Sequence, residues 1–531
     1  MSAVLRDRLF FFVVFFAIFT QIPRFLQLNF IGAFMGKNLS IYPLLIAFAY
    51  YAWNYKKAKD SFSLTETNKK FIWYIAIYVG VVLISFFHGL LIYPYYDAIL
   101  AGPVDQIEKL PAVYQKIQQV GIPMSEVTLL KLWIMARLIK GFALECVWFF
   151  GVPLLIYHWF KKDAHRGISI LQKATVCAVV LVSLYGILDI FYLSGSPVAQ
   201  AALVKLNPIV HEIKSNGTWW PPLLWNNQLR SLFAEPSYFG IYSAFAMPWL
   251  WYAMLKTHTW QKKLGFIFLL LIFTSELFFT KARTANALFL GELVLLIGVT
   301  VWQREKTFLK NTVLILVITV LTFGTTTYAM SFMPGSPNLN AEKSMGYGTE
   351  GSPKVALYLD DNLGSITSGT QRSNLSRYSI LKANMAIGQD YPLLGIGKNL
   401  RNAYIPDYLP QEAFAGSEIQ MWIHNQKEKG IMKSGFPSLG EYYTRFAETG
   451  LLGLLIYLFP SLYLFGQLIK RMRPSLYNHA QKEEAIFLFL SLAGIMASGL
   501  GDSLGITCCY WILIGIGYAF IMPEKMNQDN E

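Results

Sequence analysis

The stretch ISILQKATVCAVVLVSLYGILDIFYL, residues 168–193, decides the fold, since only two of its 26 side chains carry a charge. A helix needs about 20 mainly apolar residues to cross a bilayer. Similar runs recur along the chain, which has 531 residues, 54% of them hydrophobic and 15% charged. This composition excludes a wholly soluble enzyme, a disordered chain and a small disulfide scaffold.

Twelve apolar runs are candidates for membrane spans. They are 9–22, 41–55, 71–93, 141–160, 168–193, 237–255, 264–279, 284–302, 312–330, 449–468, 485–500 and 506–522. The sequence therefore predicts an all-α integral membrane protein with about 12 transmembrane helices. We expect about nine spans within 1–332, a large extracytoplasmic loop at 333–447, and about three spans within 448–531.

Lysine and arginine gather in every second short loop. These basic loops are 56–70, 161–166, 256–263, 304–310 and 470–473. Because basic loops stay in the cytoplasm, this alternation predicts a bacterial plasma (inner) membrane protein with both termini cytoplasmic. Much of the net charge of +13 thus reflects topology and attraction to anionic lipid, so nucleic acid is not an expected partner.

A smaller set of cations is predicted on the outer side, where orientation does not require them. The set is Arg230, Lys281, Arg283, Arg372, Arg377, Lys382, Lys398 and Arg401. Arginine is suited to bidentate recognition of phosphate. A lipid-anchored pyrophosphate that carries a sugar would fit several arginines beside the outer leaflet.

Two short stretches place charge at the membrane edge. Residues 230–240, RSLFAEPSYFG, lead into the sixth predicted span, and residues 280–284, TKART, form a hinge between two spans. The first is also compatible with a simple helix cap, and the cations of the second with side chains that reach lipid headgroups. A charge this close to hydrocarbon nevertheless raises a functional hypothesis.

Two further stretches flank the end of the large loop. One places Arg372 and Arg377 on a predicted helix, followed by the glycine-containing turn 392–397, whose N–H groups we expect to be able to hold an anion. The other, residues 441–453, returns the chain to the membrane and spaces Glu441 and Arg445 for a pair at i, i+4. A solvated helix face and a local ion pair are the simpler interpretations.

Together these stretches resemble the O-antigen ligase and polymerase superfamily. The resemblance runs from about Arg230 to about Phe459 and rests on Arg-x-x-x-x-Glu-Pro-Ser from Arg230 to Ser237, the hinge with Arg283, P-L-L-G-I-G at 392–397 and E-T-G-L-L-G at 448–453. It implies transfer of a glycan from undecaprenyl pyrophosphate to an acceptor hydroxyl at the outer face of the plasma membrane.

The resemblance also bears on the kind of transfer. The ligases look to have a histidine about nine residues before the glutamate of the last motif, where this chain has Leu439, and a serine where it has Ala282. These differences favour a Wzy-type polymerase of O-antigen, capsule or exopolysaccharide repeat units, with a ligase as the alternative. Lipid-linked donor and acceptor are the implied partners, and a flippase and a chain-length regulator are candidates.

The expected site follows from these stretches. The predicted catalytic residues are Glu235, Arg230 and Arg283; the predicted pyrophosphate-binding residues are Arg372, Arg377, Lys281 and Arg401; further candidate bases are His424, Glu441 and Asp390. Glu235 ranks first as base because the nearby bilayer should make its carboxylate more basic. Since the leaving group is already good, we expect neither a metal nor a cofactor.

Transport is the competing hypothesis. Glu145, Asp189, Glu276 and Glu292 lie within predicted spans and would then be sites for a coupling ion or proton. If the chain is an enzyme, we expect these carboxylates to be paired internally. A scaffold role in polysaccharide export is a third possibility.

Overall fold

The computed structural model describes residues 1–32, 35–57, 66–212, 228–333, 372–473 and 479–524. Within these ranges the secondary structure is helical and contains no strand. The predicted all-α fold is therefore confirmed.

Each of the twelve predicted runs overlaps a helix, although the first helix covers only residues 9–15 of the first run, 9–22. The helices are α1 (Ala3–Phe15), α2 (Ile41–Lys57), α3 (Glu66–Ile92), α7 (Val152–Phe160) as the continuation of α6 (Glu126–Cys146), α8 (Ala164–Leu193), α10 (Pro236–Lys256), α11 (Trp260–Phe279), α12 (Arg283–Gln303), α13 (Lys306–Met330), α20 (Glu441–Arg471), α21 (His479–Ser498) and α22 (Cys509–Ile521). Among the described helices, six are long and apolar enough to cross a membrane, judged by length and composition: Asn68–Ile92, Glu126–Phe160, Ala164–Leu193, Arg283–Gln303, Lys306–Met330 and Glu441–Arg471.

Local sequence explains where several helices begin and bend. Asp163 caps α8, because its side chain accepts a hydrogen bond from the N–H of Arg166 at 3.1 Å. The fourth predicted run is part of a longer helix, in which a π-helical turn at Val147–Gly151 joins α6 to α7. Such turns add a residue to the helix and often occur at functional sites.

The membrane-spanning helices pack around α10, which is buried along most of its length. Its neighbours are α8, α12 and α21. At Gly240 of α10 an added Cβ would meet the backbone and side chain of Ala285 in α12, so the two helices approach each other closely. This contact brings the start of α10 and the start of α12 to the same end of the helical body.

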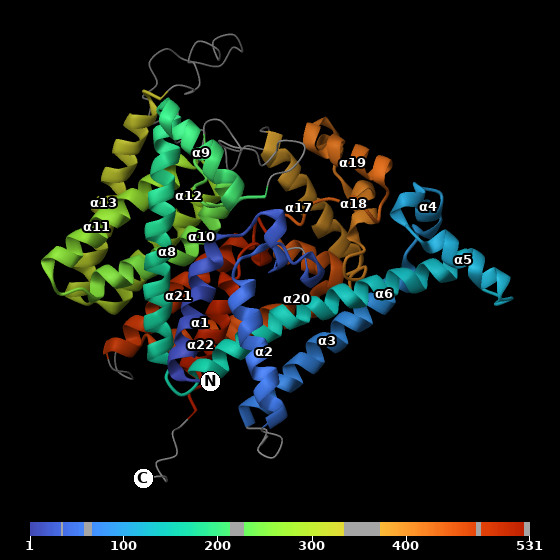
Figure 1. The fold of residues 1–531 in the computed structure, drawn as a ribbon, viewed down its shortest axis with the longest axis horizontal. Coiled ribbons are helices and arrows are strands. Elements are labelled where there is room, and N and C mark those ends of the chain that lie inside the picture. The colour runs from blue at the N-terminus through green and yellow to red at the C-terminus, as the bar shows by residue number, and fades with distance from the viewer. Residues whose placement is uncertain (33–34, 58–65, 213–227, 334–371, 474–478, 525–531) are drawn as a thin grey trace.

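The two termini lie on one side of this body (Figure 1). Lys161, between α7 and α8, forms an ion pair of 2.9 Å with Glu524 near the C-terminus. Arg6 in α1 donates a hydrogen bond of 2.9 Å to the carbonyl oxygen of Trp159 in α7. The ends of the chain are therefore neighbours of the turn between α7 and α8.

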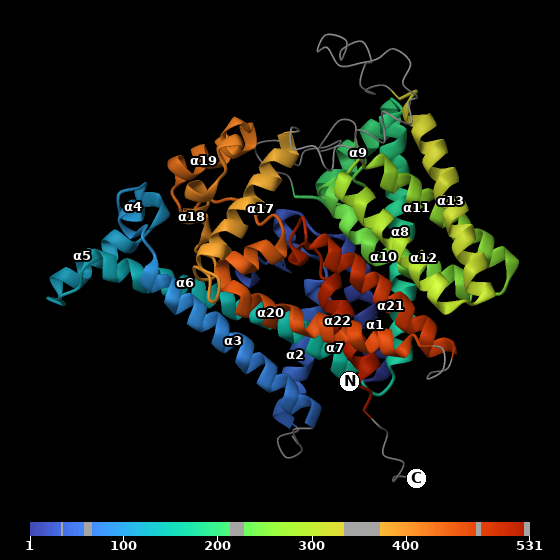
Figure 2. The ribbon, with the colours of Figure 1, turned by 180° about the vertical axis from the view of Figure 1, so that it is seen from behind.

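A helical subdomain lies on the opposite side (Figure 2). It consists of α17 (Arg372–Asp390), α18 (Arg401–Tyr408), η9 (Gln411–Ala415) and α19 (Ser417–Lys429). Its core, which includes Ile380 and Ile396, also contains Phe86 and Leu90 from α3. The predicted helix around Arg377 is thus present as α17, and residues 334–371 of the predicted loop lie outside the described residues.

A short unit, α4 (Tyr96–Leu100), η5 (Val104–Gln106) and α5 (Leu110–Gln119), connects the outer ends of α3 and α6. Between α8 and α10 lies α9 (Pro197–Val210). The 3-10 turns η1 (Phe16–Ile18), η2 (Arg24–Leu26), η3 (Asn29–Ile31) and η4 (Met35–Lys37) connect α1 to α2, and η10 (Leu504–Ile506) precedes α22.

The arrangement predicts which cysteine variants react with a membrane-impermeant maleimide in intact cells. Lys427 on α19 and Lys162 between α7 and α8 are both exposed, but they belong to opposite sides of the helical body. Because basic loops stay in the cytoplasm, we expect Lys427→Cys to be labelled at once and Lys162→Cys only after permeabilisation. Labelling of Lys162→Cys in intact cells would contradict the predicted orientation.

Candidate functional site

Two sequence motifs bind each other through their backbones. The N–H groups of Ile396 and Gly397 donate to the carbonyl oxygens of Ala447 and Glu448 at 3.0 and 2.9 Å. In the other direction, the N–H of Leu451 donates to the carbonyl oxygen of Pro392 at 2.8 Å. The segment 392–397 therefore docks against α20 and fixes the subdomain to the membrane-spanning helices.

Helix α20 is interrupted where this segment docks. Gly450 has φ 64° and ψ −169°, a conformation that is essentially restricted to glycine. An added Cβ there would run into the backbone of Leu393. The expectation that the glycine turn offers free N–H groups to an anion is wrong for Ile396 and Gly397, because α20 already accepts their hydrogen bonds.

Beside this junction lies a group of charges, here called the Arg445 cluster: Glu145, whose side chain is 29% exposed, and the more deeply buried Lys398, Glu441 and Arg445. Glu145 of α6 accepts from Arg445 Nη2 at 2.8 Å and forms an ion pair of 2.7 Å with Lys398 Nζ. Arg445 Nε donates to Glu441 Oε1 at 2.8 Å. The side chains of Lys398 and Arg445 are 7% and 12% exposed. Buried charges of this kind must be paired, since an uncompensated partner is strongly destabilising.

The cluster continues to the turn between α21 and α22. Ser503 Oγ donates to Glu441 Oε2 at 2.8 Å, and the N–H of Glu441 donates to the carbonyl oxygen of Asp502 at 3.2 Å. Arg377 Nη1 of α17 lies 3.4 Å from Asp502 Oδ1. Burial raises the pKa of the Asp502 carboxyl, and the neighbouring Arg377 guanidinium opposes that rise.

Arg377 and the predicted base Glu235 both lie within electrostatic range of Tyr238. Tyr238, in the first turn of α10, interacts electrostatically with Glu235, Arg377 and Asp502. We call these four residues the Tyr238 cluster. Glu235 is the N-cap residue of α10 and accepts a hydrogen bond from Ser237 Oγ at 3.2 Å. The Arg377 side chain keeps 35% of its surface exposed, so this cluster is accessible from one side.

The hinge 280–282 adjoins the same end of the helices. Arg283 is the first residue of α12, and both Lys281 and Arg283 are half-buried. The N–H of Leu229 donates to the carbonyl oxygen of Phe279 at 3.1 Å, which ties the segment before Glu235 to the hinge. The structure thus brings the Glu235 and Arg283 motifs together.

Arg230 faces the protein interior. Its residue surface is 1% exposed, and the backbone N–H groups of Arg230 and Ser231 donate to Asp189 Oδ2 at 3.1 and 2.7 Å. Its Nε and Nη2 make no hydrogen bond within the described part of the chain. Burial lowers the pKa of Arg230, while the nearby Asp189 opposes this effect.

Arg401 is buried as well. Its Nη2 donates to the carbonyl oxygen of Phe436 at 2.8 Å and to Ser438 Oγ at 3.0 Å, and its Nε lies 3.9 Å from Glu448 Oε1. Burial lowers the pKa of Arg401, and Glu448 counteracts the decrease. Arg372 begins α17, but its side chain lies outside the described residues.

The remaining candidate bases lie in different surroundings. Asp390, at the end of α17, is exposed and accepts a hydrogen bond from Tyr408 Oη at 2.7 Å. His424 is exposed on α19. Glu441 is 7% exposed and is already engaged by Arg445 and Ser503. Of the candidates, only Glu235 belongs to the Tyr238 cluster.

Comparison with known families now identifies this part of the chain. Residues 266–440 match the model of a family described as O-antigen ligase. The match covers about a third of the chain and supports the resemblance to the O-antigen ligase and polymerase superfamily. No curated protein matches the chain.

The O-antigen ligase match begins within α11 and ends one residue before α20. It contains Arg283, Arg377, Lys398 and Arg401, whereas Glu235 and Arg445 lie outside it. The superfamily comprises ligases and polymerases that act on lipid-linked glycans in membranes. The matched region thus supplies Arg377 to the Tyr238 cluster and Lys398 to the Arg445 cluster, and the other members of both clusters lie outside it.

The sequence analysis did not place Glu145 in the candidate site and did not single out Asp502. The expected internal pairing of Glu145 is confirmed by its contacts with Lys398 and Arg445. Asp189 is held by the backbone N–H groups of Arg230 and Ser231. The expected pairing is wrong for Glu276 and Glu292, because neither carboxylate forms an ion pair within the described residues. In that same part of the chain no group of three His, Cys, Asp or Glu side chains is placed to hold a metal ion.

The interruption of α20 predicts different effects for two glycine substitutions in one helix. Gly450→Ala forces a side chain into a glycine-only conformation and into Leu393, so we expect a loss of about 1–3 kcal/mol. Gly466→Ala adds a Cβ that meets nothing within 4 Å, so it should leave stability unchanged or slightly higher. Thermal unfolding in detergent compares them, and equal stability of both variants would contradict the docked junction.

Proposed function

We propose that this chain polymerises undecaprenyl-pyrophosphate-linked oligosaccharide repeat units at the outer face of a bacterial inner membrane. The product would be O-antigen, capsule or exopolysaccharide. The observation that carries the proposal is the Tyr238 cluster, in which Glu235 and Arg377 both lie within electrostatic range of Tyr238, near the Arg283 hinge of the matched region. It combines a candidate base with cations at one end of the membrane-spanning helices.

The proposed reaction transfers the growing glycan to a sugar hydroxyl of the acceptor lipid. The bond between the anomeric carbon and the pyrophosphate oxygen breaks, while the acceptor oxygen forms a new bond to that carbon. Glu235 takes the proton of the acceptor hydroxyl. Arg377, Arg283 and Lys281 stabilise the negative charge that remains on the departing pyrophosphate.

The buried arginines have a positioning role in this proposal. Arg230 lies buried in the segment that leads to Glu235. Arg401 contacts the backbone at Phe436 and lies near Glu448 of α20. Neither guanidinium reaches the surface, so a pyrophosphate would contact them only after a rearrangement. Arg372 is retained as a predicted pyrophosphate ligand.

Two features favour repeat-unit polymerisation over transfer to a different acceptor. Leu439 occupies the position where the ligases look to have a histidine, and Ala282 precedes the hinge arginine. A glycan ligase is the second candidate, because the matching family is described as O-antigen ligase. A flippase and a chain-length regulator are the proposed partners.

Arg377 can be tested separately from its pairing with Asp502. We expect Arg377→Ala to lower the polymerisation rate about a hundredfold, because a charge-assisted phosphate contact is lost. Purified protein is incubated with a defined undecaprenyl-pyrophosphate oligosaccharide, and the ladder of products is resolved on a gel. Lys382→Ala is the control, since Lys382 pairs with Glu412 at the exposed surface of the same region.

The double variant Arg377→Ala/Asp502→Asn shows whether Arg377 binds pyrophosphate or only neutralises the buried Asp502 carboxylate. If Arg377 serves only to neutralise buried Asp502, the second substitution restores activity. If Arg377 holds pyrophosphate, the double variant stays slow, as we expect.

Glu235 is tested by its effect on turnover. Glu235→Gln keeps the side-chain shape but cannot accept the proton, so kcat should fall by about a hundredfold or more while the affinity for the lipid-linked substrate is retained. The pH–rate profile of the variant should also lose its acidic limb. Unchanged kcat would remove Glu235 from the catalytic role and leave Asp390, His424 or Glu441.

A further inference from the structure

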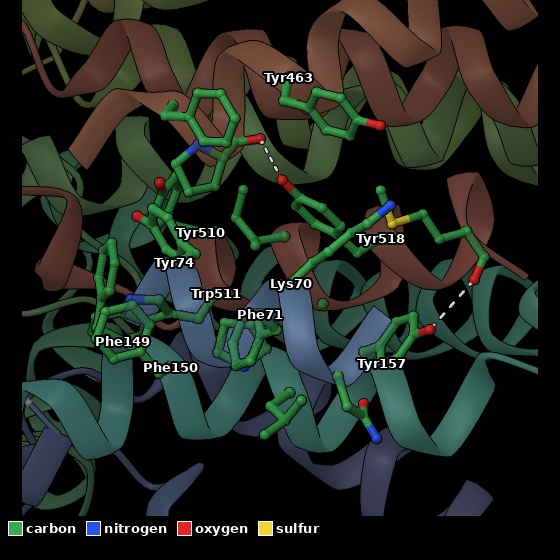
Figure 3. A pocket seen from close by; sticks show the side chains of 18 residues that line it. Lys70, Phe71, Tyr74, Phe149, Phe150, Tyr157, Tyr463, Tyr510, Trp511 and Tyr518 are labelled. Atoms are coloured by element: carbon green, nitrogen blue, oxygen red, sulfur yellow. Dashed lines mark hydrogen bonds between the residues drawn. The ribbon is translucent and has the colours of Figure 1, made fainter. Parts of the chain in front are cut away.

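An apolar groove of about 300 Å³ lies on the side of the molecule that carries the termini. Its walls come from α3, α7, α20 and α22 together with the π-helical turn before α7. Figure 3 shows that most of the side chains around it are aromatic, among them Tyr74, Phe149 and Trp511. Nothing in the proposed transfer reaction uses this groove.

Several tyrosine hydroxyls of the groove donate hydrogen bonds to the protein backbone. Pro460 lacks an N–H, so the carbonyl of Ile456 one turn earlier has no helical donor, and Tyr74 Oη donates to it at 3.1 Å. Tyr518 Oη donates to the carbonyl oxygen of Pro460 at 3.1 Å. With these hydroxyls engaged, the walls present ring surfaces, which suit an apolar occupant.

One cation stands at the end of the groove. Lys70 lies among the lining residues, near Tyr518 in Figure 3, and its side chain is exposed. No ion pair joins Lys70 to a carboxylate among the described residues. An apolar groove with a cation at its rim matches an amphiphile that has an anionic head and a hydrocarbon chain.

We propose that this groove binds one chain of an anionic phospholipid from the leaflet on the side of the termini, with the lipid phosphate at Lys70. The volume fits a segment of one hydrocarbon chain, because it is about twenty times the roughly 15 Å³ that a single water molecule requires in a cavity. Such a lipid requires no contact with the Tyr238 cluster on the opposite side.

The chain of the lipid-linked glycan substrate fits less well. Its pyrophosphate would lie at the far end of α20, and buried Tyr78, Phe149 and Tyr457 stand between the groove and Arg445. Arg445 lies 4.4 Å from the ring centroid of Tyr457, which in turn stacks on Phe149. These aromatic side chains close the direct path from the Arg445 cluster into the groove.

Binding is measured by native mass spectrometry of the full chain in detergent. The probes are dioleoyl phosphatidylglycerol, dioleoyl phosphatidylcholine and undecaprenyl phosphate. We expect one phosphatidylglycerol per protein, retained in preference to phosphatidylcholine. Lys70→Glu should weaken its binding about tenfold or more, because the phosphate contact becomes repulsive.

Leu154→Trp, which fills the groove, should reduce the binding of phosphatidylglycerol as well. The controls are Lys262→Glu on α11 and Val294→Trp on α12, at exposed positions away from the groove. Equal binding of the two phospholipids, or full binding to both the Lys70 and Leu154 variants, would overturn the proposal. Displacement of phosphatidylglycerol by undecaprenyl phosphate would also overturn it and assign the groove to a polyprenyl chain. These outcomes do not depend on polymerase activity.

Discussion

The hydrogen bonds between segment 392–397 and the interrupted helix α20 hold the functional part of the molecule together. Within a membrane protein, irregular backbone must find its partners in the protein, because lipid offers none. Here the break at Gly450 releases backbone groups of α20, and Pro392, Ile396 and Gly397 bind groups on both sides of the break. The subdomain and the spans are thereby fixed in one orientation.

That orientation brings together the charged side chains of the Arg445 cluster. Lys398 directly follows the docked segment, and Arg445 lies one turn before its contact at Glu448. Both cations converge on Glu145 of α6, and the burial of Lys398 and Arg445 would be costly without this carboxylate. Glu441 also accepts a hydrogen bond from Ser503 and donates one from its N–H to the carbonyl oxygen of Asp502. The Asp502 carboxylate in turn forms an ion pair with Arg377 of α17. Docking and charge pairing therefore depend on each other.

Sequence reasoning could predict the helices of the apolar runs and the helix around Arg377, and six helices are long and apolar enough to cross a membrane. It also grouped the four motifs at one side of the membrane. The partners across long separations were not predictable: Glu145 lies 253 residues before Lys398 and 300 before Arg445. The glycines of segment 392–397 suggested an anion site because their sequence gives no sign that α20 accepts their hydrogen bonds. Only tertiary docking decides between a turn that binds a ligand and one that binds a helix.

Burial separates the outer arginines into two kinds. A fully enclosed guanidinium, such as that of Arg230 or Arg401, loses its hydration on folding. Arg230 Nη1 then donates to the carbonyl oxygen of Ala234 at 3.4 Å, and Arg401 Nη2 to that of Phe436 at 2.8 Å. Arg377 keeps a third of its side chain exposed while Asp502 orients it, so an incoming phosphate could share it without unfolding the site. A cation that is oriented but still accessible is what a site for a doubly charged, membrane-anchored leaving group requires. The partial exposure of Arg377, more than the number of arginines in the predicted outer set, is therefore the feature on which the proposed glycan transfer rests.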